Sequence, residues 1–309
     1  MNSLRQALKD YLAMRRSLGF KLEHANGYLL SFVSFMEDQK ADVITTKLAL
    51  AWAQLPTSAT TKTWASRLSS LRGFAVYRMA EDPRTEVPPA NLLPVRCARM
   101  KPYLYTEEEI IRLMNAALEM PEASVFTGRT FYCFFGLLAV TGMRPGEVIQ
   151  MKNDDVDLSK GLITLRESKF GKSRLVPLHP STTRALAEYS EIRDKLLNRR
   201  STYFLISNRG TKLSGGRVRY TFYALSRQIG LRGMTAKNGP RLQDFRHRFA
   251  IETLSDFYRA GEDAEHWLPV LSTYLGHVNI TNTYWYLNAC PELMEQALSR
   301  LERRWEEKI

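Results

Sequence analysis

The chain has 309 residues, of which 44% are hydrophobic and 25% are charged, a composition that excludes a disordered protein and supplies one large core or two moderate ones. The 44 Lys and Arg residues outnumber the 32 Asp and Glu residues and give a formal net charge of +12 at pH 7. No apolar run reaches the roughly 18 to 20 residues that span a bilayer, and basic residues interrupt the N-terminus, so we expect no membrane segment, no signal peptide and a cytoplasmic location.

The first part of the chain has the pattern of a small helical domain. Apolar residues recur at helical spacing from residue 3 to about residue 80. Breaks at 17–19 and 56–58 divide this region into about four helices. We therefore predict an N-terminal helical domain over residues 1–92.

A stretch rich in proline follows this helical region. Such a stretch cannot continue a helix and is typical of an extended linker between domains. We expect the linker over residues 93–103 and a second domain over residues 104–309. The prolines are Pro83, Pro88, Pro89, Pro94 and Pro102.

The second domain combines helices with one small sheet. Thr106 precedes three glutamates, as at a capped helix start, and a second helix is predicted from about Arg129 to Val140, ending at Gly142. Two β-type runs, 162–165 and 174–178, flank a Gly-containing turn and predict an antiparallel hairpin. The fold class is therefore mainly α with a small antiparallel β-sheet. Further helices are predicted over 244–258, 268–275 and 291–306.

The charge is distributed unevenly along the chain. The net charge is +6 over residues 1–100, −4 over 101–159, +15 over 160–250 and −5 over 251–309. Two basic blocks separated by an acidic one indicate two cationic surfaces, which a polyanion between two lobes would neutralise, and nucleic acid is the natural candidate. The alternative is a solvated basic face without a partner.

Metal and cofactor motifs are missing from the sequence. The three cysteines, Cys97, Cys133 and Cys290, form no CxxC pair, and the five histidines are scattered. We therefore expect no disulfide framework, no metal site and no cofactor.

Two segments of the second domain carry groups suited to binding a phosphate. Arg144 stands at a helix start with Glu147 three residues later, so a guanidinium braced by an acid could fork onto a phosphate. An ordinary surface ion pair is the alternative. Lys169 lies in the hairpin turn, where it could enter a DNA groove and protonate a leaving oxygen, or simply be a solvated charge.

Two further segments supply an imidazole and a candidate nucleophile. Gln243, Arg246 and His247 share one helix face by their i, i+3, i+4 spacing. A Leu-Gly-His sequence ends at His277, and Tyr286 follows nine residues later.

Together these segments resemble the tyrosine recombinase (phage integrase) family. The family pattern has a Thr-Gly-x-Arg-x-x-Glu box, a hairpin lysine before an Arg-x-Val-Pro-Leu strand, a His-x-x-Arg-His helix, a Leu-Gly-His sequence and a tyrosine nine residues beyond it. The resemblance covers roughly residues 104–309, and the preceding helical region is similar in placement to the family's core-binding, DNA-binding domain. It implies the family's mostly helical fold.

The resemblance also implies a role for each matching residue. Arg144 and Arg246 match the arginines that grip the scissile phosphate, and Lys169 matches the lysine that protonates the departing 5′-oxygen. His277 matches a histidine that hydrogen-bonds the phosphate. Tyr286 matches the nucleophile.

One residue departs from the family pattern, and two neighbouring candidates are weaker. Gln243 stands where the family usually has histidine, so it can donate a hydrogen bond but cannot exchange protons near neutral pH. His247 matches a family histidine of its own and does not replace it. Lys172 and Tyr284 are the weaker alternatives to the hairpin lysine and the nucleophile.

The implied function is site-specific DNA recombination through a covalent 3′-phosphotyrosine intermediate, for a mobile genetic element and without a cofactor. The implied partners are double-stranded DNA and either a homo-tetramer or a mixed assembly with related recombinases, in the nucleoid. Gln243 leaves open a catalytically reduced accessory subunit, and a type IB-like topoisomerase is a further alternative.

An apolar stripe on the last predicted helix would pack on its own domain or dock on a neighbouring protomer. The stripe is formed by Leu293, Met294, Ala297, Leu298, Leu301 and Trp305.

Overall fold

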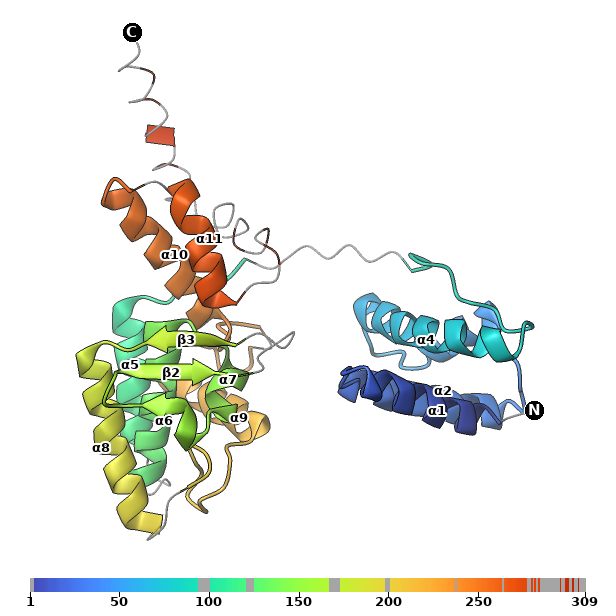
Figure 1. The fold of residues 1–309 in the computed structure, drawn as a ribbon, viewed down its shortest axis with the longest axis horizontal. Coiled ribbons are helices and arrows are strands. Elements are labelled where there is room, and N and C mark those ends of the chain that lie inside the picture. The colour runs from blue at the N-terminus through green and yellow to red at the C-terminus, as the bar shows by residue number, and fades with distance from the viewer. Residues whose placement is uncertain are drawn as a thin grey trace. The chain divides into compact units, whose positions relative to one another are not determined.

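The chain divides into two compact units, residues 1–100 and 101–309 (Figure 1). The computed structural model describes residues 3–93, 101–120, 125–166, 173–197, 201–236, 238–262 and 264–276, and beyond these the single positions 279, 281, 283, 295, 298, 299, 302 and 305. No helix within these ranges is long and apolar enough to cross a membrane.

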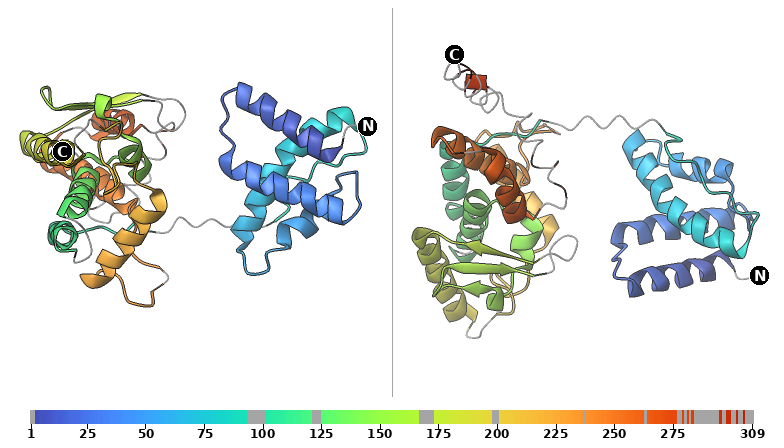
Figure 2. Two further views of the ribbon diagram at one scale, coloured as in Figure 1. Left: turned by 90° about the horizontal axis from the view of Figure 1, so that it is seen from below. Right: turned by 45° about the horizontal axis from the view of Figure 1, so that its top comes forward.

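The first unit is a bundle of four helices, as its apolar periodicity predicts (Figure 2). Ser3, Thr45 and Thr60 cap three of the helices by accepting a backbone hydrogen bond in the first turn. Phe32, Trp52 and their apolar neighbours form a separate core. The helices are α1 (Leu4–Ser17), α2 (Glu23–Asp38), α3 (Thr46–Gln54) and α4 (Thr61–Glu81).

The first half of the proline-rich stretch is not an extended linker. Arg72 of α4 donates to the carbonyl oxygens of Pro88 (2.8 Å) and Pro89 (2.9 Å). Val87 and Leu93 pack against the core of the first unit. Prolines exclude a helix here, but they do not prevent an irregular segment from docking on a helix through its carbonyl groups.

The second unit is mostly helical and contains a three-stranded antiparallel sheet in the order β1-β2-β3 (Figure 1). The predicted hairpin is confirmed, with Leu165 of β2 opposite Arg174 of β3. The third strand, β1, is only two residues long, so its alternation is too short to detect in the sequence. The strands are β1 (Val156–Asp157), β2 (Leu162–Leu165) and β3 (Arg174–Pro177).

The helices of the second unit pack around α6, which contacts α5, α8 and α10. Thr106 and Glu109 form the predicted capping box of α5, each side chain bonding the other's backbone N–H. The predicted helix 129–140 begins four residues earlier than expected, at Val125. The helices are α5 (Glu107–Leu118), α6 (Val125–Thr141), α7 (Pro145–Gln150), the 3-10 turn η1 (Asn153–Asp155), α8 (Pro180–Leu197), α9 (Gly215–Gln228), α10 (Asp244–Arg259) and α11 (Ala264–Leu275).

Candidate active site

The end of α6 lies at the candidate site and contacts α10. Gly142 terminates the helix with φ +60°, and a Cβ atom placed there would lie 2.5 Å from Cδ1 of Phe249 on α10. Only glycine adopts this conformation at this close approach without strain. The residue therefore lets α6 end directly against α10 and presents its carbonyl group to that helix.

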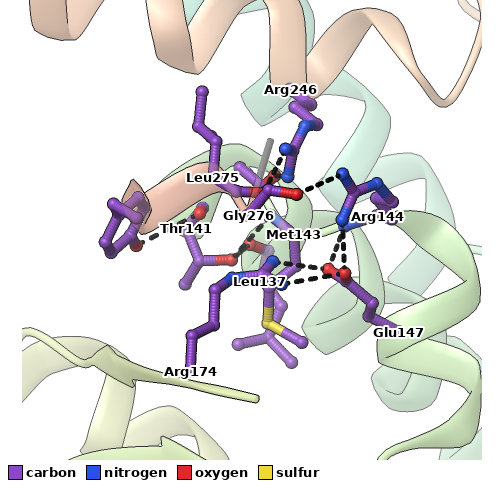
Figure 3. Close-up of polar contacts among 11 residues, drawn as sticks. Leu137, Thr141, Met143, Arg144, Glu147, Arg174, Arg246, Leu275 and Gly276 are labelled. Atoms are coloured by element: carbon purple, nitrogen blue, oxygen red, sulfur yellow. Dashed lines mark hydrogen bonds and ion pairs between the residues drawn. The ribbon is translucent and has the colours of Figure 1, made fainter. Parts of the chain in front are cut away.

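Arg144 occupies the N-cap position of α7 and is held there by Glu147 (Figure 3). Its backbone N–H donates to Oε2 of Glu147 (2.8 Å) and its Nη1 donates to Oε1 (2.8 Å). Its Nη2 donates to the carbonyl oxygen of Gly276 (3.2 Å), just beyond α11. The side chain of Arg144 keeps 20% of its surface exposed, so a ligand can reach it.

The carboxylate of Glu147 is shared with a second arginine, which comes from the sheet. Arg174 at the start of β3 donates from Nη1 to Oε1 (3.0 Å) and from Nη2 to Oε2 (2.7 Å). Burial opposes ionisation of Glu147, but the hydrogen bonds and charges of Arg174 and Arg144 outweigh it and lower the pKa of this carboxyl. The Arg144–Glu147 pair is thus not an ordinary surface ion pair, because Glu147 is only 9% exposed.

Arg246 reaches the same place from α10. Its side chain is almost fully buried. Nη1 donates to the carbonyl oxygen of Gly142 (2.9 Å) and Nη2 donates to the carbonyl oxygen of Leu275 (Figure 3). Arg144 and Arg246 therefore bond the consecutive carbonyl groups of Gly276 and Leu275, which brings two guanidinium groups from distant parts of the chain together.

Gln243 and His247 flank Arg246 in the structure. Gln243 takes the N-cap position of α10, is exposed, and makes no capping hydrogen bond with its side chain. Its carbonyl oxygen accepts the backbone N–H of Arg246 (3.2 Å). His247 is partly buried. The three side chains were predicted on one helix face, but they differ in burial. The amide of Gln243 lies at the surface, whereas the guanidinium of Arg246 lies in the interior.

Tyr274 on α11 lies beside these groups, and its hydroxyl makes a hydrogen bond that supports the fold. Its hydroxyl donates to the carbonyl oxygen of Thr141 (3.1 Å). Burial raises the pKa of Tyr274 to about 12. A buried, neutral phenol that donates to the backbone is a poor nucleophile, so Tyr274 serves to hold α11 against the end of α6.

The other predicted catalytic residues lie outside the described residues. These are Lys169, His277 and Tyr286, together with the weaker candidates Lys172 and Tyr284. The structure thus brings together Arg144, Glu147 and Arg246 among the predicted site residues. It adds Arg174, the arginine of the Arg-x-Val-Pro-Leu strand, to which the sequence reasoning gave no role because no local pattern pairs it with a distant glutamate.

Comparison with known proteins identifies the family of the chain. The Phage integrase family model matches residues 104–292. A Sinorhizobium fredii protein, y4rB, that carries the name integrase/recombinase is 50% identical over the full length of both chains. The tyrosine recombinase XerC of Thermodesulfovibrio yellowstonii is 30% identical over 72% of this chain and 70% of its own.

Two solved structures share the fold. One is the XerH site-specific recombinase bound to a palindromic difH substrate in a post-cleavage complex, with a TM-score of 0.66, 20% identity, and coverage of 97% of this chain and 85% of that one. The other is the Tn1549 transposon integrase in complex with transposon right end DNA, with a TM-score of 0.64, 15% identity, and coverage of 96% and 98%. The family match and the full-length relative show that the chain belongs to the phage integrase family of tyrosine recombinases, which supports a role in site-specific recombination.

Proposed function

We propose that the protein cleaves and rejoins DNA strands at specific sites through a covalent 3′-phosphotyrosine intermediate, in the service of a mobile genetic element. The observation that carries the proposal is the convergence of Arg144 and Arg246 on the carbonyl groups of Leu275 and Gly276, next to His277 in the chain. A pair of fixed guanidinium groups is what stabilises the charge that grows on the oxygens of a phosphoryl group in transfer.

In the proposed reaction, Tyr286 is the nucleophile and the DNA backbone is the substrate. The phenol gives its proton to solvent water and its oxygen forms a bond to phosphorus, while the bond from phosphorus to the 5′-oxygen breaks. Lys169 protonates the departing 5′-oxygen, and His277 hydrogen-bonds the phosphate. Arg144 and Arg246 neutralise the phosphoryl oxygens, and Gln243 contributes a hydrogen bond only.

Rejoining reverses this step and needs no external energy. The phosphotyrosine link conserves the energy of the phosphodiester bond, so a 5′-hydroxyl from another duplex can attack the phosphorus and release Tyr286. Cleavage and exchange are then nearly isoenergetic, and the protein needs no nucleotide cofactor.

Double-stranded DNA is the proposed partner of both units. Residues 160–250 carry a net charge of +15 and residues 1–100 carry +6, which suits a polyanion. XerH and the Tn1549 integrase, which share the fold, are described as bound to DNA. We propose residues 1–92 as a core-binding domain, 93–103 as the linker and 104–309 as the catalytic domain.

Assembly on DNA is proposed as a homo-tetramer or a mixed assembly with related recombinases. The lambda integrase, with a similar fold, is described as a tetramer bound to a Holliday junction. Leu298 and Trp305, two residues of the predicted C-terminal apolar stripe, are 57% and 72% exposed. The exposure of these two apolar side chains favours docking on a neighbouring protomer.

A nicked suicide substrate carrying the DNA sequence that the protein protects tests the proposed function. Its 5′-hydroxyl fragment diffuses away after cleavage, so the covalent adduct accumulates. We expect the wild-type protein and Tyr284→Phe to form the adduct and Tyr286→Phe to form none. Absence of an adduct with the wild-type protein in excess would contradict the proposal and favour the accessory subunit that Gln243 suggests.

A further inference from the structure

The geometry points to Arg174 as a positioning residue that offsets the charge of Glu147 and so leaves the guanidinium of Arg144 available to a DNA phosphate. The inference rests on the proposed function, because it concerns the same phosphate site. Arg174 itself is only 10% exposed and bonds Glu147, so it acts through Glu147 and Arg144.

The hydrogen bonds around Glu147 show why two arginines are needed. A carboxylate has about four acceptor positions. In this protein Oε1 accepts Nη1 of Arg144 and Nη1 of Arg174, while Oε2 accepts the backbone N–H of Arg144 and Nη2 of Arg174. The carboxylate is saturated, and Arg144 uses only one of its Nη atoms on it.

Removing Arg174 would change how Arg144 is used. Two acceptor positions of a buried carboxylate would be left empty, and an unsatisfied buried acceptor is unfavourable. Nη2 of Arg144, which now bonds the carbonyl oxygen of Gly276 (3.2 Å), belongs to a guanidinium already held by Glu147 and is the donor we expect to turn toward them. Arg144 would then grip Glu147 with both Nη atoms, as a bidentate pair.

The charge balance leads to the same result. Glu147 carries one negative charge, and Arg144 and Arg174 carry two positive charges, so the three side chains together present a net charge of +1. Without Arg174 the net charge is zero. The attraction of this part of the site for a phosphate therefore depends on Arg174, although Arg174 does not contact the phosphate.

The backbone accommodates Arg174 at a specific point. Gly276 has φ +66°, and a Cβ atom there would lie 3.0 Å from Nη1 of Arg174. The absence of a side chain at residue 276 lets the guanidinium lie against the same peptide whose carbonyl binds Arg144. Arg174 thus connects β3, the start of α7 and the residue that follows α11 (Figure 3).

The test compares variants of the full chain in the suicide-substrate assay. Arg174→Met keeps most of the apolar length of the side chain and removes its charge, whereas Arg174→Lys keeps the charge. We expect Arg174→Met to slow adduct formation about ten- to a hundredfold, with DNA affinity changed less than about threefold, and Arg174→Lys to recover part of the rate, because it restores the charge but not the bidentate geometry. Arg259→Met, which removes an exposed ion pair at the far end of α10, is the matched control and keeps the wild-type rate.

A double variant separates positioning from simple support of the fold. In Arg174→Met/Glu147→Gln no charge remains to capture Arg144, so we expect it to cleave faster than Arg174→Met. The ratio of the wild-type rate of adduct formation to the Arg174→Met rate should also become smaller when the pH is lowered from 7.5 to 5.5. In Arg174→Met, Glu147 has lost a partner that lowers its pKa, so the carboxylate is easier to protonate. A purely structural defect would be relieved by neither change.

A second probe keeps the inference testable if the wild-type protein forms no adduct. Inorganic phosphate is titrated into the full chain while the arginine side-chain N–H resonances are followed by NMR. We expect phosphate to bind at least about threefold more weakly to Arg174→Met than to the wild type. Equal phosphate binding, a wild-type cleavage rate in Arg174→Met, or strictly additive losses in the double variant would each overturn the inference.

Discussion

A single buried carboxylate, Glu147, holds two arginines that come from different elements of the second unit. Arg144 stands at the start of α7 and Arg174 at the start of β3. Burying one charge is unfavourable unless opposite charges and hydrogen bonds compensate it. Glu147 has both, so the residue orders the site and also stabilises the fold around it.

The stability that Glu147 provides depends on pH. Because the folded protein lowers the pKa of Glu147, the ionised group stabilises the fold fully above its unfolded pKa, and this stability is lost as the pH falls through the folded pKa. We expect Glu147→Gln to lower the free energy of unfolding of the second unit at pH 7 by about 3 kcal/mol. Urea denaturation at pH 7 and pH 3 checks this, and a difference from wild type that does not shrink at pH 3 would contradict it.

Gln243 provides a second prediction for a single residue. Its side chain is exposed and makes no capping hydrogen bond, so another side chain fits there at little cost to the fold. We expect Gln243→His to raise the rate of adduct formation, by up to about 10²–10⁴, because an imidazole can exchange protons near neutral pH. Gln243→Ala is the control and should be slower than wild type. A Gln243→His rate equal to or below that of wild type would show that the site has adapted to glutamine.

The residues of the site were predictable from sequence to different extents. Arg144, Glu147 and Arg246 stand in short motifs, and the structure places them together. Arg174 was not predictable as a partner of Glu147, because the two residues are 27 positions apart and strands β1 and β2 lie between them. Local spacing carries no information about such a contact.

At the level of elements, the site depends on how α6 ends. Gly142 has a left-handed backbone and lies against Phe249, whereas Gly146 in α7 has open space where a Cβ atom would stand. The two glycines are only four residues apart, so the effect of the same substitution can be compared at both positions.

We expect opposite results from alanine at these two positions. Gly142→Ala should destabilise the second unit by about 2–4 kcal/mol, from the left-handed backbone and the overlap with Phe249. Gly146→Ala should stabilise it by roughly 0.5–1 kcal/mol, because alanine favours a helix. Thermal and urea unfolding of the two variants measure both effects. Equal stability of the two variants would show that Gly142 has no special role.

Elements with strong local signals were predicted from the sequence, and those formed by tertiary contacts were not. The hairpin and the capped start of α5 follow from alternation and capping residues and are confirmed. The docking of Pro88 and Pro89, inside the predicted domain 1–92, was not predictable from their own segment, because it depends on Arg72, which lies in another element. Strand β1 is defined by its pairing with β2, which the residues of β1 alone do not indicate.

At the level of the whole molecule, each of the two units has its own core. Their basic surfaces are proposed to bind DNA phosphates, so binding should depend strongly on salt. We expect the affinity for duplex DNA to fall roughly a thousandfold between 50 and 200 mM salt, as for a protein that neutralises about six phosphates. Fluorescence anisotropy over this range measures the slope. A fall of less than about tenfold would contradict phosphate binding by both units.

The most direct measurement is to identify the atom that carries the DNA in the covalent adduct. The adduct formed on the suicide substrate is digested with protease and nuclease, and the modified peptide is sequenced by mass spectrometry. The proposed function predicts a 3′-phosphate of DNA on the phenol oxygen of Tyr286. A link to Tyr284 or to a residue of another type, a 5′-phosphate, or no adduct at all would contradict it.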